Sequence, residues 1–257
     1  MGICTDNALT YLNEIGYNVV RVPRRGINPL DVLGRDGKSL ERLGKLSQIW
    51  RSSEAVPEER PPEFASAVTG QKTNEMSTSV GLKLLYGILG SLGSAAPKLD
   101  FVFADAESIQ FTFGDVTYRG VDPFAVGSYL GHGDLSGDGP IFERYFENDE
   151  AQTYVITEVL ESASISVEAK DKKSGRIDMQ IPVIKQAIGA NLSVSSASES
   201  SGGVTFSGTV PVVFGFKVFN IAFDGKWRMS GAAPGPGLAF GAGAQPVLIS
   251  NPGMLNA

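Results

Sequence analysis

The stretch ASISVEAKDKKSGRIDMQIPV, residues 163–183, determines the fold class that we predict for this chain. Apolar and polar residues alternate on both sides of a basic turn at residues 170–176, with the period of a β-strand that has two different faces. We therefore predict an amphipathic β-hairpin with strands in residues 160–170 and 175–185. Its apolar positions are Ile165, Val167, Ile177, Met179 and Ile181.

Segments on both sides of this hairpin complete the predicted fold. Ile109 and Phe111 show the same two-residue alternation, whereas Leu40, Leu43 and Leu46 recur at the spacing of a helix face. We predict strands in residues 17–23, 100–118, 191–210 and 210–227, and helices in residues 6–16, 38–50 and 79–93. The fold class is therefore α+β, a large twisted antiparallel sheet with surrounding helices.

Composition excludes several classes of function. The 257 residues are 42% hydrophobic and 19% charged, with a net charge of −6, so no overall basic field attracts nucleic acid. The longest apolar segment, residues 79–93, contains Lys83 and is shorter than the about 20 residues of a membrane helix. A single cysteine and the lack of a secretory signal fit a cytoplasmic resting protein.

Catalytic and metal-binding groups do not converge in the sequence. The single histidine, His132, lies in the glycine-rich segment YLGHGDLSGDGP, and its pairing with Cys4 or with a serine matches no nucleophile motif. Asp134 and Asp138 lack the spacing of a calcium loop, and one Cys with one His leaves too few ligands for zinc. We predict no enzyme, no metal and no cofactor, and we read His132 as a loop residue.

Cys4, the only cysteine, is the first candidate for a functional residue. A thiol this close to the N-terminus is accessible to S-acylation, although Cys4 taken alone is better read as a small apolar side chain under the first helix. One acyl chain anchors a protein only marginally, so a second membrane signal is expected. The cluster Arg21, Arg24 and Arg25 can contact acidic lipids, or can simply be a solvated strand end.

The N-terminal region resembles one family. CTDNALTYLNEIGYNVVRVPRRGINPLDVLGRDGKSLERLGKLSQIW, residues 4–50, is similar to the start of the bacterial gasdermins: a near-terminal Cys, a short helix, a GYNVVR-P strand and an I-PL-V-G--G-L--LG-L---W continuation. Chain length and the missing enzyme site agree, so the resemblance extends over the whole chain. It implies the gasdermin pore-forming-domain fold.

This resemblance implies a pore-forming cell-death effector of anti-phage defence. In the family the cysteine at the position of Cys4 is palmitoylated, and a short C-terminal peptide keeps the protein inactive. An activating protease, caspase-like or other, removes that peptide. The monomer at rest then becomes a large homo-oligomer in the inner membrane, with membrane lipids as further partners. We expect two refolding zones, roughly residues 64–114 and 152–210, each forming one transmembrane hairpin.

The C-terminal segment suits an inhibitory role. We divide the chain into a pore-forming domain, residues 1–236, and an autoinhibitory tail, residues 237–257. The tail begins as a Gly/Ala/Pro linker, which proteases cleave readily, and we predict cleavage after Leu238 or Phe240. Its apolar residues are expected to bind a groove of the domain; they are Val247, Leu248, Ile249, Met254 and Leu255.

Two other classes of function stay open at this stage. A lipid-binding or protein-interaction module without pore activity would share the hairpin and Cys4, but it would never release liposome contents. A hydrolase would depend on His132. For the pore former, a charge at Ile165 or Val167 is expected to abolish leakage and to leave the resting fold intact.

Overall fold

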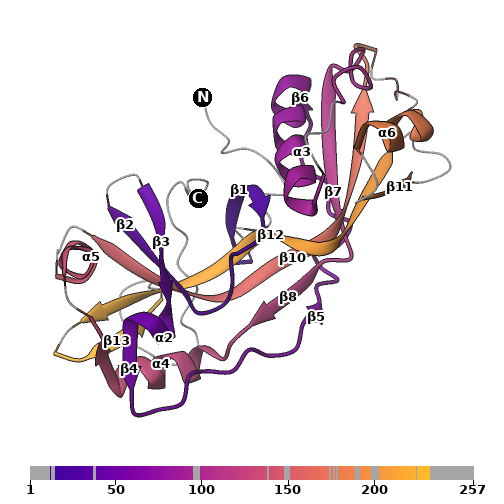
Figure 1. Ribbon diagram of the computed structural model, residues 1–257. Coiled ribbons are helices and arrows are strands. Elements are labelled where there is room, and N and C mark those ends of the chain that lie inside the picture. The colour runs from indigo at the N-terminus through magenta and orange to yellow at the C-terminus, as the bar shows by residue number, and fades with distance from the viewer. Residues whose placement is uncertain are drawn as a thin grey trace.

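Two long antiparallel strands, β10 (Gln152–Lys170) and β12 (Val204–Phe223), form the spine of the molecule (Figure 1). They pair from Thr153 opposite Ile221 to Val167 opposite Val204. The structure, a computed structural model, describes residue 12 and residues 15–231 apart from 37–38, 95–98, 138, 148–150, 174, 176, 178, 189–191, 198–202 and 224.

Further described strands extend this spine on both sides. The large sheet has eleven strands, with the central order β1–β12–β10–β2–β3, and a separate sheet pairs β4 with β9. The strands that extend the spine are β1 (Asn18–Arg24), β2 (Asp31–Asp36), β3 (Ser39–Lys45), β5 (Glu63–Phe64), β6 (Met76–Ser77), β7 (Ser108–Gly114), β8 (Thr117–Gly120), β11 (Ser193–Ser196) and β13 (Trp227–Ser230). The separate sheet consists of β4 (Trp50–Ser52) and β9 (Gly133–Leu135).

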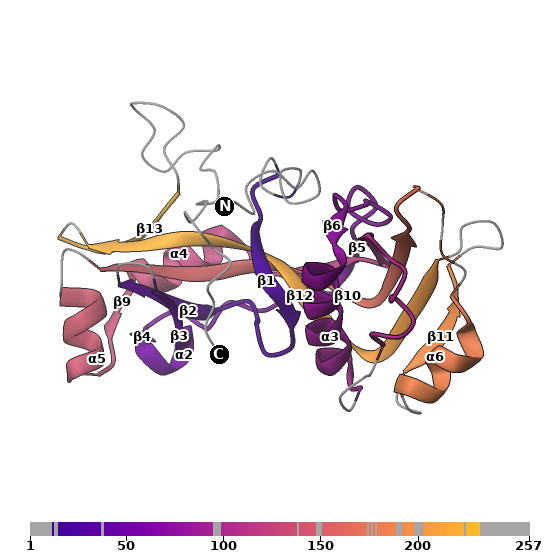
Figure 2. The ribbon, with the colours of Figure 1, turned by 90° about the horizontal axis from the view of Figure 1, so that it is seen from above.

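Helices pack at both ends of the elongated sheet. Figure 2 shows the spine as one continuous twisted ribbon, with α3 beside it between β1 and the end that carries β11 and α6. The described helices are α2 (Leu46–Ile49), α3 (Thr78–Leu92), α4 (Pro123–Gly131), α5 (Pro140–Phe142), the π-helical turn η1 (Glu143–Glu147) and α6 (Ile181–Ile188).

A bulge divides the spine into two halves. Ser162 pairs with Val212, but Ser164 pairs with Ser207, so residues 208–211 of β12 have no partner in the ladder. Pro211 lies in this bulge, where a residue without an N–H costs no ladder hydrogen bond. Beyond the bulge the strand order is β6–β7–β10–β12–β11, and we call these strands, with residues 164–170 of β10 and 204–207 of β12, the outer sheet.

The longer half of the spine has cores of its own. Trp50 meets Trp227 edge to face at a centroid distance of 5.0 Å, in a cluster that also contains residues of α4. The buried carboxylate of Asp31 lies 2.9 Å from Arg42 and 3.4 Å from Lys45, which ties β2 to β3. A buried carboxylate requires such partners, because desolvation penalises an isolated charge.

That ion cluster explains why the predicted helix in residues 38–50 is wrong. The segment forms strand β3 followed by the single turn α2. Arg42 reaches Asp31 only because Leu33 and Arg42 are paired across β2 and β3. The helical spacing of the leucines is real, but strand pairing and a buried charge outweigh so weak a preference.

The predicted second strand of the hairpin, residues 175–185, is also wrong. The described residues between 171 and 180 form turns and loop, and α6 begins at Ile181. Pro182 is favourable in the first turn of a helix, and Ile184 and Ile188 bury one face of it. The alternation that suggested a strand therefore belongs to a loop that leads into a helix.

The remaining predictions agree with the structure only in part: of the strand predicted in residues 100–118, residues 100–105 form turns and β7 begins at Ser108. The predicted fold class is confirmed. Strands β1, β7, β11 and β12 lie in the segments predicted as strands, and helix α3 corresponds to the predicted helix 79–93. Of the helix predicted in residues 6–16, only Leu12 and residues 15–16 are described, and Leu12 is helical and buried. The boundary at residues 236–237 lies outside the described residues.

Candidate functional site: the outer sheet and its helical cover

The outer sheet has one apolar face and one face of hydroxyl groups. Ile165 pairs with Phe113 and with Phe206, and Val167 pairs with Phe111 and with Val204, so these side chains share one face. Residues of that face that are no more than 5% exposed are Ile109, Phe111, Ile165, Val167, Ala169, Val194, Val204 and Phe206.

The opposite face of the outer sheet carries serine and threonine. Ser166 Oγ lies 2.7 Å from Thr205 Oγ1, and Ser207 Oγ donates to Ser164 Oγ at 3.4 Å. Two ion pairs lie on this face: Glu168 with Lys72, with Nζ 2.8 Å from Oε1, and Lys170 with Glu75. These groups keep their hydrogen bonds or remain near water, so this face needs no cover.

Helices α3 and α6 cover the apolar face. Leu85, Ile88, Leu89 and Leu92 of α3 are no more than 2% exposed, and Ile184 and Ile188 of α6 pack into the same cluster. Burial of such a side chain stabilises by about 1.5–3 kcal/mol, so the four from α3 contribute roughly 6–12 kcal/mol. The cover is therefore strong enough to hide the apolar face in water.

The C-terminal end of α3 is fixed by several contacts. Gly93 adopts the left-handed conformation, φ 116°, that ends a helix without strain from a side chain. Arg25 Nη2 donates to Leu92 O at 3.1 Å, and the hydroxyl of the buried Ser94 donates to Ile188 O of α6 at 3.1 Å. One end of α3 is thus joined both to the segment after β1 and to α6.

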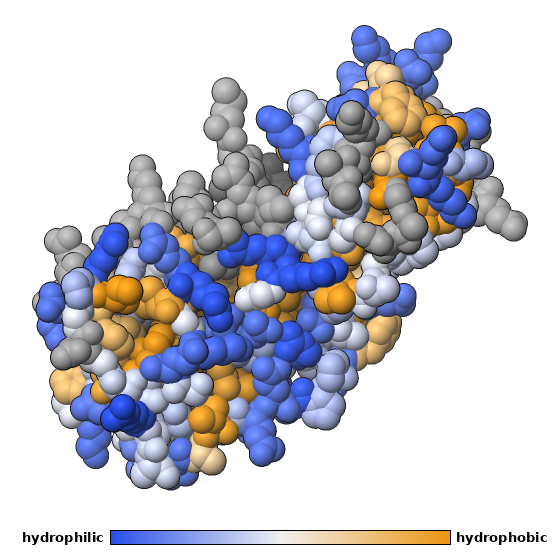
Figure 3. Space-filling view, in the orientation of Figure 1, coloured by the Kyte–Doolittle hydropathy of each residue, from blue (hydrophilic) through white to orange (hydrophobic). Residues whose placement is uncertain are grey.

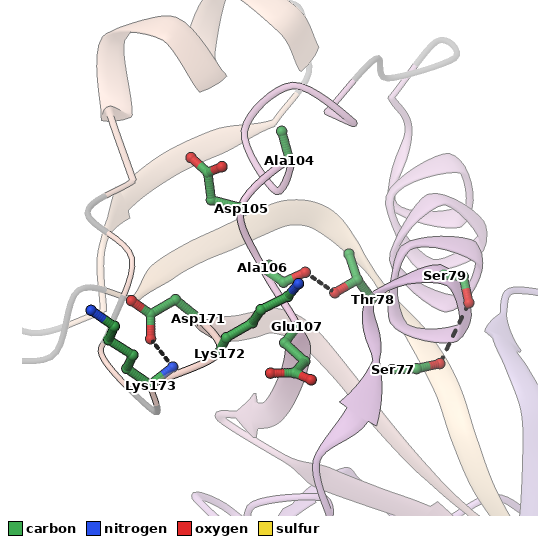
Figure 4. A pocket seen from close by; sticks show the side chains of 10 residues that line it. All are labelled: Ser77, Thr78, Ser79, Ala104, Asp105, Ala106, Glu107, Asp171, Lys172 and Lys173. Carbon is green, nitrogen blue, oxygen red and sulfur yellow. Dashed lines mark hydrogen bonds between the residues drawn. The ribbon is translucent and has the colours of Figure 1, made fainter.

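An open hollow of about 660 Å³ lies at the other end of α3 (Figure 4). It lies between the start of the helix, the loop 104–107 and the turn 171–173. Thr78 Oγ1 donates to Ala106 O at 2.6 Å, and Lys172 reaches over the hollow toward these groups (Figure 4). Three carboxylates and two lysines line it, so neither charge dominates, and no nucleophile faces a base.

Charged groups mark the end of the hydroxyl-rich part of β10. Glu158 accepts hydrogen bonds from Tyr17 and from Lys217, the latter at 2.8 Å, and Glu161 forms an ion pair with Arg119 at 3.1 Å. Burial, followed by the charge of Glu158, raises the pKa of Tyr17, so its hydroxyl stays protonated and acts as the donor. From Ser162 to Lys170 the strand carries only Glu168 and Lys170 as charges.

Among the described residues, none is placed to form a catalytic dyad or triad with His132. Its side chain is exposed at the end of α4, and Nδ1 lies 2.9 Å from Ser128 O and 3.8 Å from Glu54. In a catalytic triad the nucleophile and the carboxylate contact different nitrogens of the histidine ring, whereas Ser128 and Glu54 both lie nearest to Nδ1 of His132. Asp134 accepts from Trp227 Nε1 at 2.8 Å, a structural role. Among the described residues no cluster of three His, Cys, Asp or Glu side chains can hold a metal.

The structure brings some of the predicted site residues together. Ile165, Val167 and Met179 are buried in one cluster, and Ile177 and Ile181 pack against it half-buried. All five thus contribute to the core under the helical cover, although the last three do not lie on a strand.

The predicted basic cluster is only partly visible. Arg24 is half-buried, which lowers the pKa of its guanidinium, and Arg25 is exposed and bound to α3. Arg21 lies in β1, and its side chain is outside the described part. The remaining predicted positions also lie outside the described residues: Cys4, Leu238, Phe240, Val247, Leu248, Ile249, Met254 and Leu255.

Sequence reasoning missed the true neighbours of the outer half of β10. β10 pairs with β7 and β12 in the outer sheet, and α6 replaces its expected partner. Pro182 followed by Ile184 and Ile188 was the available signal for α6. No local signal identifies the partners of β10, because they come from segments about 50 residues before it and 40 after it.

None of the described helices is long and apolar enough to cross a bilayer. In the view of Figure 3, apolar side chains reach the surface at both ends of the molecule, and hydrophilic side chains dominate between them.

Comparison with known proteins gives a consistent answer. The Bacterial Gasdermin Family matches residues 20–231. A protein named gasdermin bGSDM from Vitiosangium sp. is 34% identical over 241 residues, 91% of this chain and 88% of its own length. Another gasdermin bGSDM, from a Desulfuromonadales bacterium, is 32% identical over 86% of this chain and 83% of its own length.

A solved structure agrees in fold. A bacterial gasdermin from Bradyrhizobium tropiciagri superposes with a TM-score of 0.65 at 17% identity, covering 88% of this chain and 91% of that one. The two-faced outer sheet, the family match over residues 20–231 and relatives above 30% identity over most of their length lead to one conclusion: the chain belongs to the Bacterial Gasdermin Family.

Proposed function

We propose that this chain is a pore-forming protein that inserts its outer sheet into a membrane as β-hairpins. The observation that carries the proposal is the contrast between the two faces of that sheet: one is apolar and covered by helices, the other is lined with hydroxyl groups. Gasdermins are known for pore formation, and membership of this family supports the same activity here.

The outer half of β10 has the length and pattern of a membrane strand. A tilted strand needs about 9–11 residues to cross the bilayer, with apolar side chains toward lipid and polar ones toward water. Residues 162–170 of β10 supply nine such positions, and Glu161 limits the stretch. Ile165 and Val167 would face lipid, while Ser164 and Ser166 would face the water-filled lumen.

Insertion requires α3 and α6 to leave the sheet. A sheet in lipid must have every backbone group paired, so the hairpins of many copies must close into a barrel. Each proposed refolding zone, residues 64–114 and 152–210, contains one of the two covering helices. We propose that each helix becomes the second strand of a hairpin, and that a large homo-oligomer forms from monomers.

Proteolysis is the proposed trigger. Removal of the tail, after Leu238 or Phe240, would release the domain of residues 1–236, with a caspase-like or other protease as the partner. Palmitate on Cys4 and contacts of Arg21, Arg24 and Arg25 with acidic lipids would hold it at the membrane. The protein would be cytoplasmic before cleavage and in the inner membrane after it, where leakage would kill the cell and limit phage growth.

Dye release from anionic liposomes tests this function. A protease site is introduced near Gly237, and we expect release only after the protein is cut, because the uncut chain keeps its outer sheet covered. The original sequence, treated with the same protease, is the control. Membrane binding without release from the cut protein would instead support a lipid-binding module and would rule out the pore.

A further inference from the structure

Arg25, from outside α3, holds the C-terminal end of that helix. Its Nη2 donates to the carbonyl of Leu92 at 3.1 Å, and Arg25 directly follows strand β1. The last carbonyls of a helix have no partner within the helix and carry its negative dipole end. The last turn of α3 contains no basic residue of its own, so Arg25 supplies both a donor and a positive charge there.

This helix end is also where the covering elements meet. Ser94 Oγ donates to Ile188 O, so the ends of α3 and α6 are joined by one buried hydrogen bond. Gly208, in the bulge of β12, lies so close to the end of α3 that a Cβ at this position would be 3.1 Å from Leu92 O. A displacement of Leu92 would therefore disturb β12 and α6 together with α3.

Arg25 is exposed, so ligands from solution can reach it. The guanidinium group carries five N–H donors in a fixed fork. A carbonyl is a single neutral acceptor, whereas a phosphodiester offers two charged oxygens that accept in parallel, and such charge-assisted bonds are about twice as strong. A phosphate that reaches Arg25 is thus a better partner for it than Leu92 O.

We propose that Arg25 is a latch on α3, which opens when its guanidinium moves from the Leu92 carbonyl to the phosphate of an anionic phospholipid. The proposal rests on the proposed function, since it assumes that α3 must leave the outer sheet. Loss of the latch frees the end of α3 that is joined to α6, so the membrane surface itself would loosen the cover.

Hydrogen exchange of the full chain in solution tests the contact. Arg25→Gln is expected to speed exchange of the amides in the last turn of α3 by about two- to fivefold, the effect of one charge at a helix end. Arg51→Gln, the same change at an exposed arginine of β4, should leave these amides unchanged. Equal exchange in the Arg25→Gln and original proteins would overturn the latch.

The source of the phosphate is tested with two probes. Vesicles of phosphatidylcholine and phosphatidylglycerol in equal parts are expected to speed exchange in the original protein, whereas sodium phosphate at the same ionic strength is not. Acceleration by sodium phosphate alone would overturn the assignment to a lipid surface.

Leakage by the cut protein separates a latch from a simple lipid contact. On phosphatidylcholine vesicles, a latch predicts that Arg25→Gln leaks about two- to fivefold faster than the original protein. It also predicts that added phosphatidylglycerol speeds leakage by Arg25→Gln less than it speeds leakage by the original protein. A variant that is slower on the anionic vesicles and no faster on the neutral ones would overturn the latch. Absence of leakage from every protein would contradict the proposed function, and the exchange result would still decide the latch.

Discussion

Adjacent residues of β10 have opposite environments. Ile165 is 1% exposed beneath α3, whereas the next residue, Ser166, exchanges a hydrogen bond with Thr205 on the hydroxyl face. The expectation that a charge at Ile165 or Val167 leaves the resting fold intact is therefore wrong. A carboxylate at either position would lie in the core with no partner.

Ile165→Asp should unfold the resting protein, because an unpaired buried charge costs more than about 4 kcal/mol, a large part of a typical domain's stability. Ser195→Asp puts the same charge on the exposed face of β11 and should change the free energy of unfolding by less than about 0.5 kcal/mol. Urea unfolding followed by circular dichroism measures both. Equal midpoints for the two variants would show that Ile165 is not in the core.

Helix α3 must separate from the sheet if the apolar face is to enter lipid. A disulfide between positions 92 and 208 can test this separation, because a Cβ at position 208 would lie 3.2 Å from Leu92 Cβ. That separation is a few tenths of an ångström short of the Cβ–Cβ distance in disulfides, about 3.5–4.5 Å. A small shift of the helix end would allow the bond.

Leu92→Cys with Gly208→Cys is expected to block leakage when oxidised and to restore it after reduction, since the disulfide holds α3 on β12. Both cysteines are introduced together with Cys4→Ser, and the Cys4→Ser protein alone is the control for the reductant. The reduced form is the internal control for the core change at Leu92. Full leakage from the oxidised, cut protein would mean that the end of α3 stays on β12 in the pore.

In the whole molecule, the spine joins two ends that have separate hydrophobic cores. The longer half keeps its buried pairs, such as Asp31 with Arg42, while the outer sheet stores the apolar surface under α3 and α6. In the proposed function, removal of the tail, residues 237–257, determines when this apolar face becomes exposed.

Expression of residues 1–240 in bacteria should stop growth, whereas expression of the full chain should not, because only the shorter protein lacks the inhibitory segment. The control for colony counts is residues 1–240 with Ile165→Asp, which should not fold and should therefore not be toxic. The cysteine pair Leu92→Cys and Gly208→Cys is a second non-toxic control only when the protein is exported to an oxidising compartment, where the disulfide can form. Normal growth with soluble, folded residues 1–240 would count against autoinhibition by residues 241–257.

Local patterns in the sequence determined several parts of this protein. Alternation of apolar and polar residues identified β7, β11 and the outer parts of β10 and β12, because each of them buries one face. A continuous hydrophobic run identified the rest of β12, which is buried on both faces at residues 212–216. A nearly apolar segment that ends in a glycine identified α3. The motif of residues 4–50 indicated the family, which the matches then established.

Only the tertiary structure decided which segments pair. Period-two alternation shows which face of β10 is apolar, but the pairing depends on edges brought together by distant parts of the chain, so β7 and β12 could not be inferred. Arg42 makes residues 38–50 a strand through a buried carboxylate, and Arg25 meets Leu92 across 67 positions. Sequence patterns report burial along one element, whereas contacts between elements exist only once the chain has folded.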